Sequence, residues 1–475
     1  MIAALLVFAF AGRLGIGMEC LDRDLWDPKP AYSHLTDLGI RRARLQSGWA
    51  RTEKVKGQYD FAWLDSIVNE LVRRGVEPWI SLSYGNPIYA AACDGEQSYT
   101  GQKMNPLHSP EGLAAWQAYV RAIVKRYGAQ VRVWEVWNEP DCKHFFMPLP
   151  GKTWAEEYVE LLRITSETVR AVQSDARIAV CTAAGPDGRL RQTIRLFELG
   201  AGRYADIYTF HAYSARPEDF TRTCQDAFYG TIRRYAPKIE FWRGEAGLSS
   251  KNSGRGALSN IPLSEETQAR WMSRHLVRDL ADPEISMTSY FHLFDFDHYT
   301  HEVTYHYGVL RDKDYSRKPS FAVLQRIKRL FDDGNAKPDR LMNMTMTPLK
   351  GATPEEADFI GGAVIHTFRR HGVPMIAYSA SSDVTVARPE VKCRALAFFG
   401  NGEEVWKDPV VFDLVDGSIV RPPFRKDWPE PKLELPVRDH TLVLTEASAL
   451  APHYSAGESQ ATPAAKLSVE QVDHE

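Results

Sequence analysis

Short apolar runs alternate with longer amphipathic segments from Arg13 to about Phe331. Each apolar run has the length of a buried strand, and each following segment carries its apolar residues at helical spacing. Glycine after several of these segments and proline at the start of others are typical helix boundaries. The predicted helices are Pro30–Leu38, Phe61–Arg74, Pro110–Tyr127, Trp154–Val172, Leu190–Leu199, Phe220–Tyr235, Glu265–Leu280 and Pro319–Phe331.

Eight strand-then-helix units in succession predict an α/β fold, specifically a (β/α)8 TIM barrel over residues 1–335. A doubly wound open sheet is the structural alternative, but such a sheet normally carries a glycine-rich phosphate turn after its first strand. The first apolar run, RLGIGMEC, is not followed by a turn of this kind. The pattern therefore favours the closed barrel.

The pattern changes after Asp332, where short alternating runs are separated by HG, NG and DG turns. Alternation with a period of two between such turns is typical of antiparallel strands. We expect a C-terminal β-sandwich accessory domain over residues 336–454 and a disordered tail at 455–475, where small and polar residues dominate. Residues 1–12 form either an extra strand or a signal remnant, so the sequence leaves localisation open.

The 475 residues include 58 basic and 61 acidic side chains, which gives a formal net charge of −3. This balance provides no broad basic field, so we expect no nucleic-acid partner. No apolar run reaches about 18 residues, so we expect no membrane span. The six cysteines include no CxxC pair, and we expect neither a metal nor another cofactor. A disulfide between the loops of Cys93 and Cys142 stays open.

Two glutamates stand at strand ends, where TIM barrels carry their active groups. Glu139 ends the run VRVWEVWNEP, and Glu245 ends KIEFWRGE. Strands 4 and 7 lie on opposite sides of the barrel mouth, so we expect the two carboxyl groups to face each other. A separation of about 5–5.5 Å suits a retaining glycosidase and about 6.5–9.5 Å an inverting one. Glu135, deeper in strand 4, is interpreted as the structural partner of an interior arginine.

The motifs WNEP on strand 4 and HAY on strand 6, with Glu245 on strand 7, resemble the retaining glycoside hydrolases of clan A. The segment LQSGWARTEKVKGQYDFAWLD is similar to the second-strand region of glycoside hydrolase family 39, with families 5 and 42 as alternatives. The resemblance implies that Glu139 is the general acid/base and Glu245 the nucleophile. It further implies a donor to the sugar 2-OH (Asn138), two groups that keep the nucleophile ionised (Tyr213 and Arg44) and a group at the pocket rim (His211).

Further polar and aromatic residues near the strand ends are candidates for sugar binding. Trp242 is less favoured, because its odd spacing from Glu245 predicts that it faces the helices. The remaining candidates are Glu19, Trp49, Tyr84, Trp137, Arg243 and His292.

These observations predict an enzyme, a retaining glycoside hydrolase that acts on a carbohydrate by double displacement. Long loops after several strands favour exo action. Two alternatives stay open: a non-catalytic carbohydrate-binding barrel, which would commonly lose one of the two carboxylates, and a transglycosylase that shares the covalent intermediate. The sequence does not identify the sugar, the linkage or the oligomeric state.

Overall fold

A computed structural model describes residues 12–89, 105–185, 190–219, 222–252, 257–258, 261–300, 303–399, 406–425 and 432–450. The predicted N-terminal strand or signal remnant falls almost wholly outside these residues, as do Cys93 and the predicted tail. Within the described residues, none of the helices is long and apolar enough to cross a membrane.

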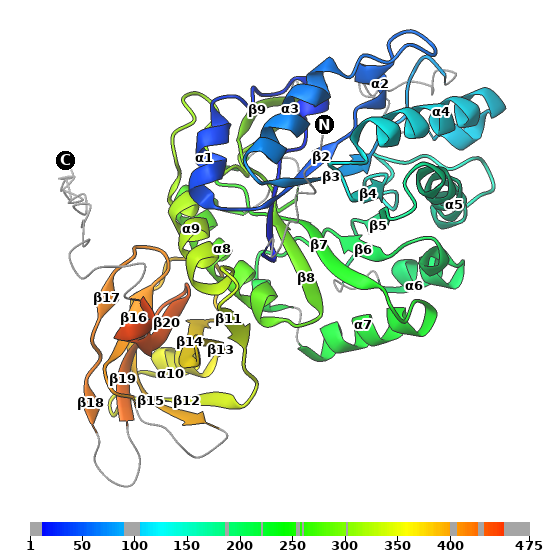
Figure 1. Cartoon of the computed structure of the whole chain (residues 1–475). Coiled ribbons are helices and arrows are strands. Elements are labelled where there is room, and N and C mark those ends of the chain that lie inside the picture. The colour runs from blue at the N-terminus through cyan, green and yellow to red at the C-terminus, as the bar shows by residue number, and fades with distance from the viewer. Residues whose placement is uncertain are drawn as a thin grey trace, which may run out of the picture.

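Eight parallel strands close into a barrel, because β1 pairs with both β2 and β8 (Figure 1). The predicted TIM barrel is therefore confirmed. The strands are β1 (Leu14–Gly17), β2 (Arg42–Gln46), β3 (Glu77–Leu82), β4 (Val133–Val136), β5 (Arg177–Thr182), β6 (Ile207–Phe210), β7 (Glu240–Ala246) and β8 (Ile285–Tyr290).

Helices surround the barrel, and some of them begin at a side chain that caps the first turn. Ser109 accepts a hydrogen bond from the Gly112 N–H, and Thr153 forms a capping box with Glu156. These contacts satisfy backbone N–H groups that the helix itself leaves without acceptors. The helices are α1 (Ala31–Leu38), α2 (Trp49–Thr52), α3 (Ala62–Arg73), α4 (Pro110–Tyr127), α5 (Trp154–Val172), α6 (Leu190–Glu198), α7 (Arg222–Tyr235), α8 (Glu265–Ala281) and α9 (Pro319–Phe331).

A layer of apolar side chains closes the lower end of the barrel interior. It contains Trp79, Val133, Ala179, Ile207, Trp242 and Met287. The prediction that Trp242 faces the helices is therefore wrong. The register of β7 against β8 shifts between Arg243 and Ala246, so strict alternation fails, and both Trp242 and Glu245 point into the barrel.

The C-terminal part consists of two antiparallel sheets and follows α9, so the boundary predicted at residue 335 falls between α9 and β11. One sheet has the order β11-β13-β14-β20-β16-β17 and the other β12-β15-β19-β18, and a separate apolar core lies between them. The sheets lie beside α8 and α9 (Figure 1). Their strands are β11 (Ala336–Pro338), β12 (Met342–Pro348), β13 (Ala363–Arg370), β14 (Val373–Ala380), β15 (Val391–Phe399), β16 (Pro409–Asp413), β17 (Ile419–Val420), β18 (Phe424–Arg425), β19 (Lys432–Val437) and β20 (Leu442–Glu446), with helices α10 (Pro354–Gly361) and α11 (Ala447–Leu450).

A hairpin of β9 (Phe296–Thr300) and β10 (Val303–Tyr305) follows the last barrel strand, where the sequence predicts only a loop.

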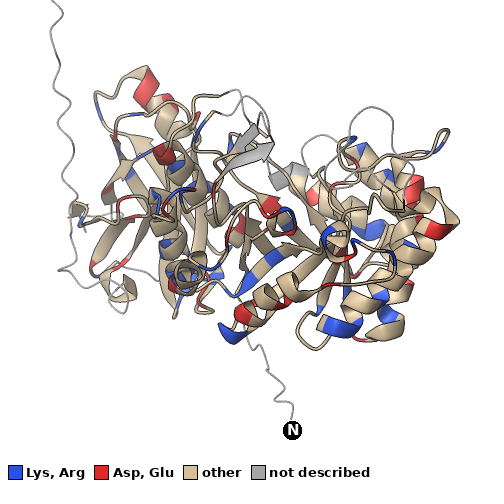
Figure 2. Cartoon of the chain, turned by 90° about the horizontal axis from the view of Figure 1, so that it is seen from above, with Lys and Arg blue, Asp and Glu red and all other residues tan. Residues whose placement is uncertain are grey.

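Basic and acidic residues are mixed over both parts of the chain (Figure 2), as the small net charge suggests.

Candidate active site

Glu139 and Glu245 converge at the barrel mouth from opposite strands. One carboxylate oxygen of each and a ring nitrogen of His211 all lie within 4.8 Å of one another. Both glutamate side chains are 13% exposed, so solvent reaches them. The backbone after β4 adopts the left-handed region at Trp137 (φ 63°) and Glu139 (φ 47°). Such values are costly for residues other than glycine, and they are typical of backbone that aims functional side chains.

Two donors hold the Glu245 carboxylate. Arg44 Nη1 lies 2.9 Å from Oε2, and the Tyr213 hydroxyl donates to Oε1 at 2.5 Å. Burial and the Glu245 charge raise the pKa of Tyr213 well above its usual value, so the hydroxyl keeps its proton. The cation and the hydroxyl together stabilise a negative charge on Glu245.

Glu139 has a different partner. His211 Nδ1 lies 2.8 Å from Glu139 Oε1 and 3.4 Å from Glu245 Oε2. Burial lowers the pKa of His211, although the Glu245 charge opposes this effect. At neutral pH the ring is uncharged, so the Nδ1 atom contributes at most one N–H between the two carboxylates. The two acids therefore sit in unlike environments, one beside a cation and the other beside a neutral imidazole.

Arg44 lies at the centre of the site and is fully buried. Its Nη2 donates to Glu135 and, at 2.7 Å, to Asn138 Oδ1, while Nη1 also lies 3.1 Å from Glu19 Oε1. Burial opposes the charge of Arg44, but the surrounding carboxylates outweigh burial and hold its pKa well above the usual value. The interpretation of Glu135 as the partner of an interior arginine is confirmed.

Asn138 is fixed from both ends of its amide. Its Oδ1 accepts from Arg44, and its Nδ2 donates to the Tyr84 hydroxyl at 2.8 Å. The Tyr84 ring stacks on Phe145 with centroids 5.8 Å apart, and Trp137 Nε1 donates to the Phe145 carbonyl. The apolar loop after β4 thus packs directly against the residues that orient Asn138.

Glu19 and His292 form the floor of the site on the β1 side. Glu19 is 2% exposed, His292 is fully buried, and Glu19 Oε2 lies 3.4 Å from His292 Nε2. Both predicted residues therefore belong to the cluster around Arg44.

Three predicted sugar contacts take other positions. Arg243 points out of the barrel, where its Nε lies 2.7 Å from Asp279 on α8, so it does not contact Glu245 and the prediction is wrong. Trp49 is 1% exposed and stacks on Tyr119, and Trp137 is fully buried. Their rings are core rather than open platforms, although Trp49 and Tyr84 line a cavity of about 210 Å³ with Asp22, Arg23, Gly48, Ala50 and Arg51.

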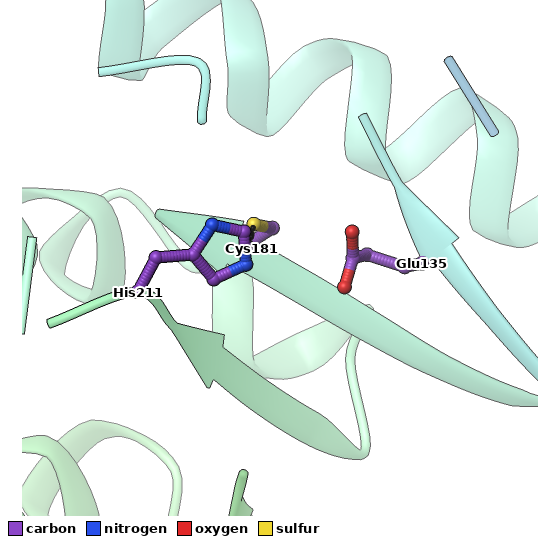
Figure 3. Close-up of side chains that lie close together, drawn as sticks. All are labelled: Glu135, Cys181 and His211. Carbon is purple, nitrogen blue, oxygen red and sulfur yellow. Dashed lines mark hydrogen bonds between the residues drawn. The ribbon is translucent and has the colours of Figure 1, made fainter. Parts of the chain in front are cut away.

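Sequence reasoning misses Cys181, which lies behind His211 (Figure 3). Its Sγ is 3.5 Å from His211 Nε2, and these two groups and Glu135 have the spacing of metal ligands. However, Glu135 is already bonded to Arg44 and to the Thr209 hydroxyl, and burial with the Glu135 charge raises the pKa of Cys181 well above its usual value. A thiolate is the form that binds metals, so these donors fit a hydrogen-bonded network better than a metal centre.

The fold and the paired carboxylates define a TIM barrel with an acidic mouth, and sequence comparison places it more closely. Residues 37–215 match the family model of Glycosyl hydrolases family 39. This part of the chain is therefore similar to glycosyl hydrolase family 39, and the expected resemblance is confirmed.

Individual relatives agree with this assignment. The chain is 32% identical over 126 residues to a beta-xylosidase of Caldicellulosiruptor saccharolyticus, covering 25% of this chain and 24% of that protein. It is 26% identical over 149 residues to a beta-galactosidase of Clostridium cellulovorans, covering 28% of this chain and 22% of that protein. The matches thus span about a quarter of the length of these curated relatives. A family 39 glycoside hydrolase from Bacteroides cellulosilyticus WH2 shares the fold, with a TM-score of 0.64 and 18% identity over 91% of this chain and 80% of that one.

Proposed function

We propose that this protein is a retaining glycoside hydrolase in which Glu245 is the nucleophile and Glu139 the general acid/base. The observation that carries the proposal is the carboxylate pair, with one oxygen of each within 4.8 Å. This spacing supports the shorter of the two glycosidase geometries, about 5–5.5 Å between carboxyl groups, which leaves no room for a water molecule between Glu245 and the anomeric carbon.

The environments of the two acids support the division of roles. A nucleophile must be a carboxylate, and Glu245 accepts from both Arg44 and Tyr213. A general acid must gain and lose a proton easily, and Glu139 contacts the His211 imidazole, whose pKa burial lowers. His211 lies within reach of both acids, which suits a group that keeps their separation constant through the reaction.

The reaction then proceeds in two balanced steps. Glu245 attacks the anomeric carbon, the bond to the leaving oxygen breaks, and Glu139 gives that oxygen its proton. In the second step Glu139 takes a proton from water, the water oxygen bonds to the anomeric carbon, and the ester bond to Glu245 breaks. Asn138, fixed between Arg44 and Tyr84, is placed to contact the sugar 2-OH in both steps.

We also propose exo action. Packing of Phe145 on Tyr84 and of Trp137 against the Phe145 carbonyl supports a wall on one side of the site. Each cleavage of a xylo- or galacto-oligosaccharide should release one monosaccharide and leave the chain one unit shorter, and early release of fragments from the interior of the chain would contradict this part. These sugars are the first to test, because the curated relatives are named as a beta-xylosidase and a beta-galactosidase.

The test compares variants on aryl glycosides. We expect Glu245→Ala to lower kcat/KM by more than about 10⁴-fold, with azide restoring turnover as a glycosyl azide of inverted configuration. Glu139→Ala should stay active only on substrates with good leaving groups, and azide should then give the retained product. Glu167→Gln, which removes an exposed carboxylate on α5, is the matched control and should behave as wild type.

Three outcomes would contradict the proposal. Proton NMR of the first product with inverted configuration would exclude double displacement. Sugar binding without turnover in wild type would favour a carbohydrate-binding barrel. Dominant transfer to an added alcohol rather than to water would favour a transglycosylase.

A further inference from the structure

Glu19 lies deep in the site, and its side chain folds back over β1. A Cβ atom placed on Gly17 would lie 2.3 Å from Glu19 Oε2, so only glycine leaves room for this carboxyl group. Glu19 is 2% exposed. The residue is therefore built into the barrel interior rather than placed at its solvent-facing rim.

Acidic groups outnumber basic groups around Glu19. The carboxyl groups of Glu19, Glu135 and Glu245 all contact the single guanidinium of Arg44. Burial lowers the pKa of His292 to about 3, so this ring adds no positive charge at neutral pH. The titratable groups that face Glu19 are Arg44 from β2, Glu135 from β4 across Arg44, Glu245 from β7, His292 after β8 and the neighbouring Cys20, and the charge of Arg23 acts on His292. Glu19 and Glu135 are buried and Glu245 is 13% exposed, so three negative charges on the one guanidinium would be costly, and one of the three acids is expected to hold a proton.

Hydrogen bonding identifies that acid. Glu135 and Glu245 each accept donors on both of their oxygens. Within the described part of the chain, Glu19 Oε2 and His292 Nε2 have no well-aligned partner, although they lie 3.4 Å apart. His292 Nδ1 lies 3.0 Å from the Phe294 carbonyl oxygen and 3.1 Å from the Phe294 backbone nitrogen, so it can donate to the first or accept from the second. In the tautomer in which Nδ1 carries the ring proton and donates it to the carbonyl oxygen, Nε2 presents a lone pair to Glu19.

We propose that Glu19 is a positioning residue that works as a neutral carboxylic acid: Oε2–H faces His292 Nε2, Oε1 accepts from Arg44, and the guanidinium charge is left to Glu135 and Glu245. This inference rests on the proposed function only for the role of Glu245. Burial above all, partly offset by Arg44 and reinforced by Glu245, raises the pKa of Glu19 to about 8, which agrees with the geometry.

The first test does not need turnover. In protein labelled with carboxyl-13C glutamate, NMR should show one glutamate that titrates between pH 7 and 9. This signal should be absent in Glu19→Gln and present in the surface control Glu167→Gln. Absence of such a signal in wild type, or its persistence in Glu19→Gln, would overturn the proposal. Because the free protein is measured, the result stands whether or not the chain cleaves glycosides.

The second test separates a neutral acid from a carboxylate. Glutamine keeps an acceptor for Arg44 and a donor for His292, whereas leucine keeps neither. On an activated aryl glycoside at pH 6, we expect Glu19→Leu to lose at least 100-fold in kcat/KM and Glu19→Gln to keep at least 20-fold more kcat/KM than Glu19→Leu. If glutamine is as damaging as leucine, Glu19 works as a carboxylate and the proposal fails.

Discussion

At the scale of single residues, one buried guanidinium organises the site. Arg44 contacts Glu19, Glu135, Asn138 and Glu245, which come from or follow three different barrel strands. A planar group with five donors can satisfy several acceptors at once, which a lysine could not do in the same geometry. Each partner thus fixes the position of the others, and Arg44 in turn orients the Glu245 carboxylate.

The Tyr213 hydroxyl gives a direct test of this scheme. Tyr213→Phe removes one of the two donors to Glu245, and we expect kcat/KM to fall by about 10²–10³-fold, as for the loss of a charge-stabilising donor in other active sites. The rate of covalent labelling by a 2-deoxy-2-fluoro aryl glycoside measures the step in which Glu245 attacks. Tyr229→Phe is the control, because its hydroxyl donates to Asp282 outside the site. Equal labelling rates in wild type and Tyr213→Phe would contradict the assignment.

The sequence predicts some residues of the site better than others. Glu139 and Glu245 are predictable because an acid at the end of an apolar strand has no structural reason to be there. Arg243 and Trp242 are misplaced because a register shift in β7 breaks the alternation on which the prediction depends. Trp49 is wrongly expected at the sugar because sequence alone does not show the aromatic cluster of Trp116, Tyr119 and Tyr89 that encloses it.

At the scale of elements, the barrel depends on buried ion pairs between strands and helices. Asp279 Oδ2 on α8 lies 2.7 Å from Arg243 Nε on β7. It also accepts a hydrogen bond from the Thr288 hydroxyl on β8 at 2.9 Å. Burial opposes the charge of Asp279, but Arg243, His275 and Arg278 outweigh burial and hold its pKa well below the usual value. The strand that carries Glu245 is thus tied to the helix behind it.

Removing the charge of Asp279 should therefore lower the free energy of unfolding. Asp279→Asn leaves Arg243 buried without its counter-ion, and we expect the free energy of unfolding to fall by about 3–5 kcal/mol. Urea denaturation at pH 7 measures this. Glu284→Gln breaks a partly exposed pair with Arg233 and should cost less than about 1 kcal/mol. Similar effects of the two substitutions would show that Asp279 does not anchor β7.

Protonation of His275, which also lies on α8, should make the free energy of unfolding depend on pH. Burial lowers the pKa of His275 to about 4, while an unfolded histidine takes up a proton near its usual value of 6.5. As the pH drops, the unfolded chain binds this proton at a higher pH than the folded protein does. The free energy of unfolding therefore falls between pH 6.5 and about pH 4, and His275 causes no further loss below about pH 4. We expect His275→Gln to lack this loss, so that its stability deficit against wild type shrinks by about 3 kcal/mol between pH 7 and pH 4. A constant deficit would show that His275 is protonated in the folded protein.

Elements with strong caps are the most predictable ones. The helices α4, α5 and α9 match the predicted ranges because Pro110, Thr153 and Pro319 mark their starts. The hairpin of β9 and β10 is missed because its sequence, FDHYTHEVTY, alternates charged and aromatic residues without a two-residue turn signal.

At the scale of the whole molecule, the C-terminal sheets dock on the barrel through buried polar contacts. The Arg274 side chain on α8 is fully buried. It pairs with Glu218 and donates to the carbonyl oxygens of Ser382 at 3.0 Å and Asp439 at 3.3 Å. Phe331 of α9 packs on Phe368 of β13, with ring centroids 4.9 Å apart. Contacts this well buried couple two domains more strongly than a flexible linker would.

This coupling predicts a single unfolding transition for the described barrel and sheets. Arg274→Ala removes the cation from Glu218 and the donors from two sheet carbonyls, so we expect a loss of about 3–5 kcal/mol in the free energy of unfolding. Differential scanning calorimetry should show one peak in wild type, and the substitution should lower the midpoint of the whole peak or split it in two. Arg163→Ala, which breaks exposed pairs on α5, serves as the control. Two separate peaks in wild type, with only the smaller one shifted by Arg274→Ala, would mean that the sheets fold independently and that the barrel does not need them to hold its site.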